Sequence, residues 1–301
     1  MIEQSLTSTD SEHSLDRKTR LMRRVVDIVT NRIAEGLHNN TLRISHADDL
    51  TVEKNANQSQ IKRLSDLLRY RGNIIMCNHT APDNFIQRHF SSLLPYGGST
   101  PLDALMIIEL INQTRLITES DPTPPSPLIL QGANFGTSNE EKARTMQDIR
   151  KLELAFQEKV SIAPVLPGTN SFFNLQAIRS ARDKLFSGGS VIVFPEKEYT
   201  QPEDLGNHTI QDGIGVIARL SSAPILPIYI QGSESYPGVL SLPGNKTKGV
   251  AMIVGTPVSP TPDQHVSKED RINAYLAAQH EAWQQIIRMQ RMFDPRFHSS
   301  I

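Results

Sequence analysis

The feature that most constrains the fold of this chain is an alternation of short apolar runs with longer segments of helical periodicity. The apolar runs have the length of buried strands and lie at 74–77, 128–130, 161–166, 191–194, 224–230 and 250–254. Between them, apolar residues recur at helical spacing, as at 172–186 and 210–221. Strands that alternate with helices are typical of α/β folds. We therefore predict a central mixed sheet with helices on both faces, plus an N-terminal and a C-terminal helix.

One apolar run leads directly into residues suited to chemistry. Asn78 and His79 follow the run 74–77, and Asp83 lies in the turn before a helix expected from Asn84. Ligand crevices in α/β proteins open at the carboxyl ends of strands. A histidine with a carboxylate nearby can act as an oriented general base. His79 and Asp83 are therefore a candidate catalytic pair, and a purely structural polar turn is the alternative.

Composition limits the classes of protein to consider. The 301 residues carry a formal net charge of -1, which gives no general attraction to nucleic acid. The one cysteine, Cys77, excludes an internal disulfide, fits a reducing compartment and is expected in the core. We find no apolar run near the ~20 residues that cross a bilayer, and no signal peptide in the first residues. We expect a cytoplasmic protein, soluble or peripheral on a membrane.

The segment 15–35 is predicted to form a basic amphipathic helix. Its apolar residues recur at helical spacing, and five basic residues lie in its first half: Arg17, Lys18, Arg20, Arg23 and Arg24. Such a helix can lie on an anionic membrane surface. It can equally pack its apolar stripe on its own domain, with the charges in solvent. Peripheral membrane contact through this helix is therefore one of two open interpretations.

The chain divides into four parts by composition. Residues 1–14 are expected to be a disordered tail, and 15–58 to be the N-terminal helix followed by a polar linker. Residues 59–262 hold the alternating strands and helices of the α/β domain. Residues 263–301 contain a long helix whose apolar stripe is expected to pack on that domain.

Three of the expected strand ends carry polar or proline motifs. The first is Asn78-His79 followed by Asp83; the second is Phe194-Pro195-Glu196 after Gly-Gly-Ser and an apolar strand; the third is Pro224-Ile225-Leu226-Pro227. Their order resembles that of the glycerophospholipid acyltransferase family, over residues 71–255. An acyltransferase-like α/β domain is the fold that this resemblance implies.

The resemblance also implies an activity. It is the transfer of a fatty acyl group from a thioester of coenzyme A or acyl carrier protein to a hydroxyl of glycerol 3-phosphate or a lysophospholipid. His79 would be the general base, Asp83 would orient it, and Glu196 would bind the acceptor. No metal or cofactor beyond the thioester co-substrate is expected. The further candidate substrate-binding residues are Asn78, Thr80, Lys197, Arg179 and Arg182.

Two departures from the family pattern leave other functions open. Asp83 follows His79 at a spacing one residue shorter than in the family, which favours a catalytically silent lipid-binding or scaffold protein. The family's Gly-Thr-Arg after the glutamate is Lys197-Glu198-Tyr199 here, and the missing arginine favours an acceptor without phosphate. A thioesterase, in which His79 activates water, is a further alternative.

Overall fold

The computed structural model describes the predicted strands and several of the predicted helices, and one strand that the sequence pattern does not predict. The described residues are 17–39, 41–48, 57–69, 72–79, 102–117, 125–132, 139–156, 159–165, 172–196, 202–207, 210–232, 250–260 and 267–293. The strands are β1 (Leu42–His46), β2 (Ile74–Cys77), β3 (Leu128–Gly132), β4 (Ser161–Val165), β5 (Val191–Val193), β6 (Ile225–Gln231) and β7 (Val250–Val254). The helices are α2 (Arg17–His38), α3 (Asn57–Arg69), α5 (Leu102–Ile117), α6 (Asn139–Ala155), α7 (Phe172–Phe186), α8 (Gly213–Ser221), α9 (Lys268–Phe293) and the 3-10 helix η1 (Pro202–Asn207).

The described strands form one mixed sheet, as predicted. Their order is β1-β7-β6-β2-β5-β3-β4, and neighbours are parallel except β6 and β7. The strand β2 pairs with β5 on one side and β6 on the other, so it lies at the centre of the sheet. Because β2, β5 and β6 are parallel, their carboxyl ends meet at the same edge.

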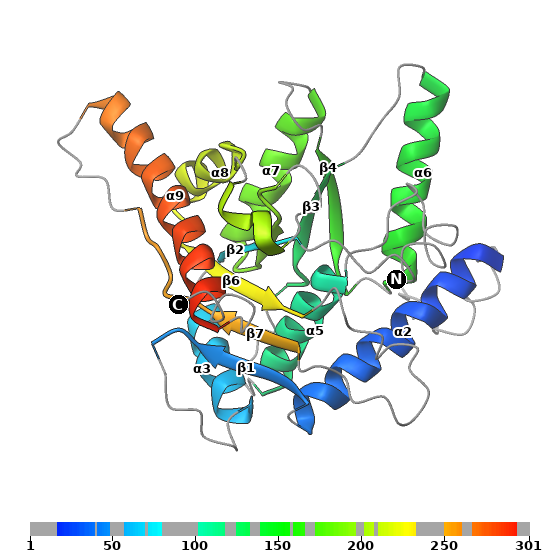
Figure 1. The fold of residues 1–301 in the computed structure, drawn as a ribbon. Coiled ribbons are helices and arrows are strands. Elements are labelled where there is room, and N and C mark those ends of the chain that lie inside the picture. The colour runs from blue at the N-terminus through cyan, green and yellow to red at the C-terminus, as the bar shows by residue number, and fades with distance from the viewer. Residues whose placement is uncertain are drawn as a thin grey trace, which may run out of the picture.

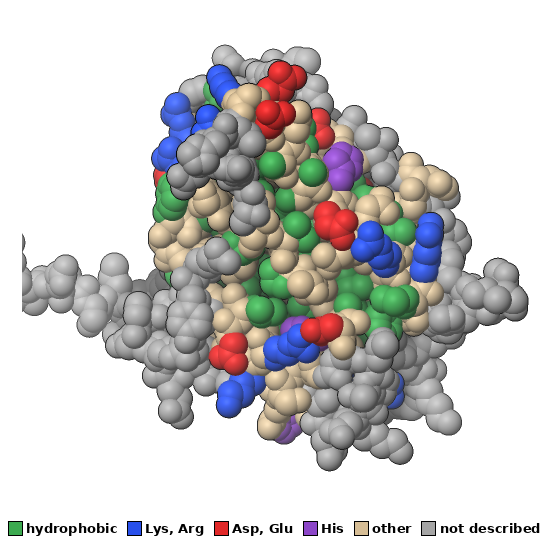
Figure 2. Space-filling model, turned by 90° about the vertical axis from the view of Figure 1, so that its left-hand side faces the viewer, with side chains coloured by type: hydrophobic (Ala, Val, Ile, Leu, Met, Phe, Trp, Pro, Cys, Tyr) green, Lys and Arg blue, Asp and Glu red, His purple; other side chains and the backbone are tan. Residues whose placement is uncertain are grey.

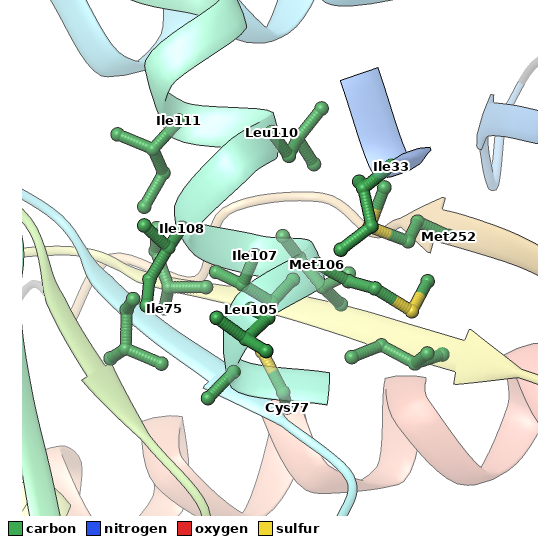
Figure 3. Packing of buried hydrophobic residues seen from close by; sticks show 14 of the residues in the cluster. Ile33, Ile75, Cys77, Leu105, Met106, Ile107, Ile108, Leu110, Ile111 and Met252 are labelled. Carbon is green, nitrogen blue, oxygen red and sulfur yellow. The ribbon is translucent and has the colours of Figure 1, made fainter. Parts of the chain in front are cut away.

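Helices cover both faces of the sheet, and each face has its own hydrophobic core (Figure 1). On one face, α2, α3, α5 and α6 contribute to a core with alternate residues of β2, such as Ile75 and Cys77. Figure 3 shows Ile75 and Cys77 beside Leu105 and Ile108 of α5. On the other face, α7, α8 and α9 pack on Ile74 and Met76. The strand β2 is therefore apolar on both sides, which explains its unbroken apolar run.

The apolar stripe of α2 packs on the protein's own domain. Met22, Val26, Val29 and Ile33 are buried, and α2 contacts α5, α6 and β1. The basic residues Arg17, Arg20 and Arg24 lie on the exposed side of the same helix. Burial of the stripe is the ordinary outcome for a helix with one apolar face.

The predicted linker within 15–58 is wrong in part, because it contains the edge strand β1. Leu42 and Ile44 point into the core, and β1 pairs in parallel with β7. The Asn57 side chain holds this strand: its Oδ1 accepts from the N–H of Ile44, and its Nδ2 donates to the carbonyls of Leu42 and Leu37. The strand has only five residues, and two polar positions alternate with its inward side chains. Such a short alternation is not recognisable within a polar sequence.

Several sequence-based predictions lie outside the described residues. They are the tail at 1–14 and the helix from Asn84. None of the described helices is long and apolar enough to cross a membrane. On the face of the molecule on the side of α9, acidic and basic side chains are interspersed among small groups of hydrophobic ones (Figure 2).

The packing of α2 predicts different effects for two isoleucines of this helix. Ile33 is 0% exposed and Ile28 is 52% exposed. Ile33→Ala should lower the free energy of unfolding by about 2–5 kcal/mol, because it leaves a cavity between α2 and the sheet. Ile28→Ala should change it by less than about 0.5 kcal/mol. Urea unfolding measures both, and equal losses would show that the helix is not packed as described.

Candidate functional site

The carboxyl ends of β2 and β5 bring His79 and Glu196 together. Met76 of β2 is paired with Val193 of β5, so the residues that follow both strands leave the sheet side by side. The backbone N–H of His79 donates a hydrogen bond to Oε1 of Glu196, at 3.0 Å. A side chain more than a hundred residues away along the chain thus fixes the backbone at His79.

Asn78 continues the pairing of β2 with β6 through its side chain. Its Oδ1 accepts from the backbone N–H of Ile230 at 2.7 Å, and its Nδ2 donates to the carbonyl of Ile230 at 2.9 Å. The amide side chain thus takes the place of a backbone unit in the ladder, and it is buried. These bonds use one N–H of the amide and one lone pair of its oxygen, and they hold the end of β2.

A carboxylate that the sequence analysis did not select faces His79. Oδ2 of Asp103 lies 3.4 Å from Nδ1 of His79, which is longer than a well-formed hydrogen bond. Asp103 lies in the first turn of α5, where the helix dipole favours a negative charge, and its side chain is 2% exposed. The imidazole also contacts the ring of Phe194, with 4.7 Å between ring centroids. The histidine ring therefore lies against both an acid and an aromatic side chain.

Nothing in the local sequence identifies Asp103 as a partner of His79. An acid in the first turn of a helix is common and serves the helix itself. The two residues are separated by more than twenty positions, and only the packing of α5 on β2 brings them together. The signal available in the sequence was the acid itself, in the first turn of α5.

Burial dominates the electrostatics of Glu196. It raises the pKa of this carboxyl to about 8; the hydrogen bond from His79 N–H opposes the shift, and the nearby Asp103 adds to it. Within the described residues, Oε2 of Glu196 is buried and has no hydrogen-bond partner. A protonated carboxyl at this position has one oxygen that accepts from the backbone and one O–H that can donate.

Cys77 is a core residue, as predicted. Its side chain is fully buried, and burial raises the pKa of the thiol well above its ordinary value; Asp103 and Glu196 raise it further. A thiol in such surroundings stays protonated, so it does not supply a nucleophile.

The structure does not bring all predicted site residues to His79. Arg179 and Arg182 lie on α7, and Arg182 pairs with Asp183 at 2.8 Å. Because α7 runs from the carboxyl edge of the sheet towards the amino edge, Arg182 lies well away from the His79 turn. Asp83, Thr80 and Lys197 lie outside the described residues.

The geometry suits proton transfer. A histidine flanked by a buried carboxylate can take a proton from a weak nucleophile, and the carboxylate stabilises the imidazolium that forms. Among the residues that the structure describes, no cluster of His, Cys, Asp and Glu has the composition of a metal site.

Comparisons with known proteins give little beyond this geometry. No protein-family model matches the chain, and no curated protein sequence matches it. Among solved structures, the chain is similar to the 1-acyl-sn-glycerophosphate (LPA) acyltransferase PlsC from Thermotoga maritima. The TM-score is 0.40, the sequence identity is 14%, and the match covers 94% of this chain and 86% of the other. A likeness of this strength assigns no function.

The raised pKa of Glu196 predicts how stability depends on pH. The folded pKa is about 8 and the ordinary value is 4.5, so the folded state holds this proton more tightly. Its contribution to stability is therefore complete below about 4.5 and is lost as the pH rises towards about 8. Glu196→Gln keeps an acceptor for His79 N–H but does not ionise. The stability of this variant relative to the unmodified protein should rise across that window.

Urea unfolding of both proteins at several pH values measures this effect. Asp183→Asn, which changes an exposed acid on α7, is the matched control and should show no comparable rise. A constant difference between Glu196→Gln and the unmodified protein at all pH values would contradict the assignment.

Proposed function

We propose that this protein is an O-acyltransferase in which His79 is the general base and Asp103 orients it. The observation that carries the proposal is the contact of Nδ1 of His79 with the buried carboxylate of Asp103 at the carboxyl edge of the sheet. The motifs around His79 and Glu196, which resemble those of glycerophospholipid acyltransferases, support acyl transfer over other uses of a histidine base.

The reaction needs few groups from the protein. Because the Nδ1 side of the imidazole faces Asp103, Nε2 takes the proton of the acceptor hydroxyl. The hydroxyl oxygen then bonds to the acyl carbon of the thioester, and the carbon–sulfur bond breaks. The departing thiolate receives the proton from Nε2, which restores the neutral histidine. The acyl donor is a thioester of coenzyme A or acyl carrier protein.

Glu196 supports the reaction through its contact with the backbone of His79. Its Oε1 holds the His79 backbone, and its raised pKa keeps the carboxyl largely protonated at neutral pH. The O–H of a protonated Oε2 can donate a hydrogen bond to an oxygen of the bound acceptor or of the tetrahedral intermediate. This role refines the acceptor-binding role that the sequence motif implies for Glu196.

The acceptor is a hydroxyl compound of the glycerolipid type. Glycerol 3-phosphate and lysophospholipids fit the motif resemblance. A second candidate, an acceptor without phosphate, is favoured by the charges around the site. The charged group that acts on Glu196 is another acid, Asp103, and Arg182 is paired with Asp183 on α7. A phosphate group at this position would face acids in the described part of the site.

Replacing the two proposed catalytic groups should abolish turnover without unfolding the protein. His79→Ala should lower the rate of thioester consumption by roughly 10²–10⁴-fold, the usual contribution of general base catalysis. Asp103→Asn should lower it by at least roughly 10²-fold, because the amide neither fixes the ring nor stabilises the imidazolium. The assay measures free thiol release from long-chain acyl-coenzyme A or acyl carrier protein, with each acceptor in turn.

The matched control is Asp83→Asn, which changes the acid that the sequence spacing suggests. A large loss with Asp103→Asn and a small one with Asp83→Asn assigns the orienting role to Asp103, and the reverse result would overturn that assignment. Thiol release that needs no acceptor would mark a thioesterase. Lipid binding without thiol release from either donor would mark a silent lipid-binding protein.

We propose the exposed side of α2 as the surface that meets a membrane. Arg17, Arg20 and Arg24 lie on this side, with the exposed side chains of Leu21 and Ile28 among them. Cations around protruding apolar groups suit the interface of an anionic bilayer. This arrangement would bring the enzyme to lipid acceptors while the opposite stripe of α2 stays in the core.

Charge reversal on α2 tests this surface. The double change Arg20→Glu and Arg24→Glu should release the protein from phosphatidylglycerol vesicles, because each basic residue near the surface adds about 1 kcal/mol of attraction. Sedimentation with the vesicles measures binding, and the control is charge reversal of the exposed Arg179 on α7. Equal binding by all three proteins would refute the proposed surface.

A further inference from the structure

Two basic side chains meet at the amino end of the sheet, away from the His79 site. Arg115 lies in the last turn of α5, and Lys184 lies in the last turn of α7. These helices cover opposite faces of the sheet and end at the same edge, near the start of β2 and β3. The stem of Lys184 lies against Gly189, and Pro125 lies against the same glycine. Lys184 is close enough to Arg115 for the charge of Arg115 to act on it.

Both side chains are partly buried, and burial disfavours their charged forms. Within the described residues, Nε of Arg115 is buried and has no hydrogen-bond partner. Burial lowers the pKa of Arg115. Burial also lowers the pKa of Lys184, and the nearby charge of Arg115 lowers it further. Each effect disfavours the charged form, so this arrangement costs the protein stability.

No acid in the described part of the chain compensates this pair. Asp183, next to Lys184 in sequence, pairs instead with Arg182 at 2.8 Å. The carbonyl of Lys184 accepts hydrogen bonds from Gly189 N–H and from the Ser187 hydroxyl, so the end of α7 is already capped. Lys184 is not needed there as a cap. Two like charges that have no counter-charge among the described residues can bind an anion from outside.

We propose that Arg115 and Lys184 form a binding site for a phosphate-type dianion at the amino end of the sheet. The guanidinium of Arg115 matches the geometry of phosphate oxygens through parallel N–H donors, and Lys184 adds a second positive charge. The ligand chemistry is that of inorganic phosphate or a phosphate monoester. An anion between the two cations would remove their repulsion and accept a hydrogen bond from Nε of Arg115, which has no acceptor among the described residues.

This site is separate from the catalytic one. Asp103 begins α5 beside His79, and Arg115 ends it, so about 18 Å of helix lies between them at 1.5 Å per residue. The inference therefore does not depend on the proposed acyl transfer. His79→Ala should bind the dianion as the unmodified protein does, whatever the outcome of the activity assays.

Calorimetric titration with inorganic phosphate, at constant ionic strength and a pH at which phosphate is dianionic, tests the site. Arg115→Gln and Lys184→Gln should each weaken binding roughly tenfold or more, since each removes a charged hydrogen-bond donor. The matched control is Arg288→Gln, which removes an exposed charge from α9 and should leave binding unchanged. Equal weakening in all three variants, or no binding to the unmodified protein, would overturn the proposal.

Thermal unfolding without phosphate shows whether each variant is folded. Each site variant should be at least as stable as the unmodified protein, because it relieves a like-charge contact, and it should lose the rise in Tm that phosphate gives the unmodified protein. A site variant that keeps this rise would count against the proposal. Competition with glycerol 3-phosphate, adenosine 3′,5′-bisphosphate and phosphatidic acid vesicles then distinguishes the sources. A competitor that acts only when Arg115 is present carries the natural group, and free phosphate is the ligand if none does.

Discussion

The arrangement of the candidate site depends on two hydrogen bonds between the Asn78 side chain and the backbone of Ile230. They extend the pairing of β2 with β6 by one unit and fix the point at which the chain leaves the sheet. His79 follows at once, and its N–H is taken up by Glu196 from the neighbouring strand end. A side chain that repeats the donor and acceptor of the backbone ends the strand without leaving buried groups unpaired. The chain at His79 is thereby fixed by bonds to β6, through Asn78, and to Glu196 at the end of β5.

The site also places two acids beside one histidine in a buried region. Two carboxylates at close range disfavour ionisation, and burial acts in the same direction. Glu196 is the one whose pKa rises, and it bonds to the backbone of His79, whereas Asp103 faces the ring. Different surroundings thus give the two acids different protonation behaviour, which suits the separate roles proposed for them.

The sequence predicted the helices α2, α7, α8 and α9 and all described strands but one, because these elements have a clear apolar period. The strand Leu42–His46 was missed, since its pairing and its support by Asn57 come from distant parts of the chain. His79 and Glu196 were selected by their places after buried strands, a local signal. Asp103 was missed because its contact with His79 depends on how α5 packs over β2. Local patterns thus located the groups at strand ends, and tertiary packing decided which acid meets the ring.

The strand β1 links the order of synthesis to the completion of the fold. Leu42 pairs with Val250, so β1, the first described strand, can pair only after β7, the last one, has been synthesised. On the ribosome, the apolar residues Leu42 and Ile44 have no paired strand until β7 has emerged. Contacts so distant in sequence slow folding and expose strand edges to other chains. The nascent protein therefore has a long interval in which chaperones can protect it.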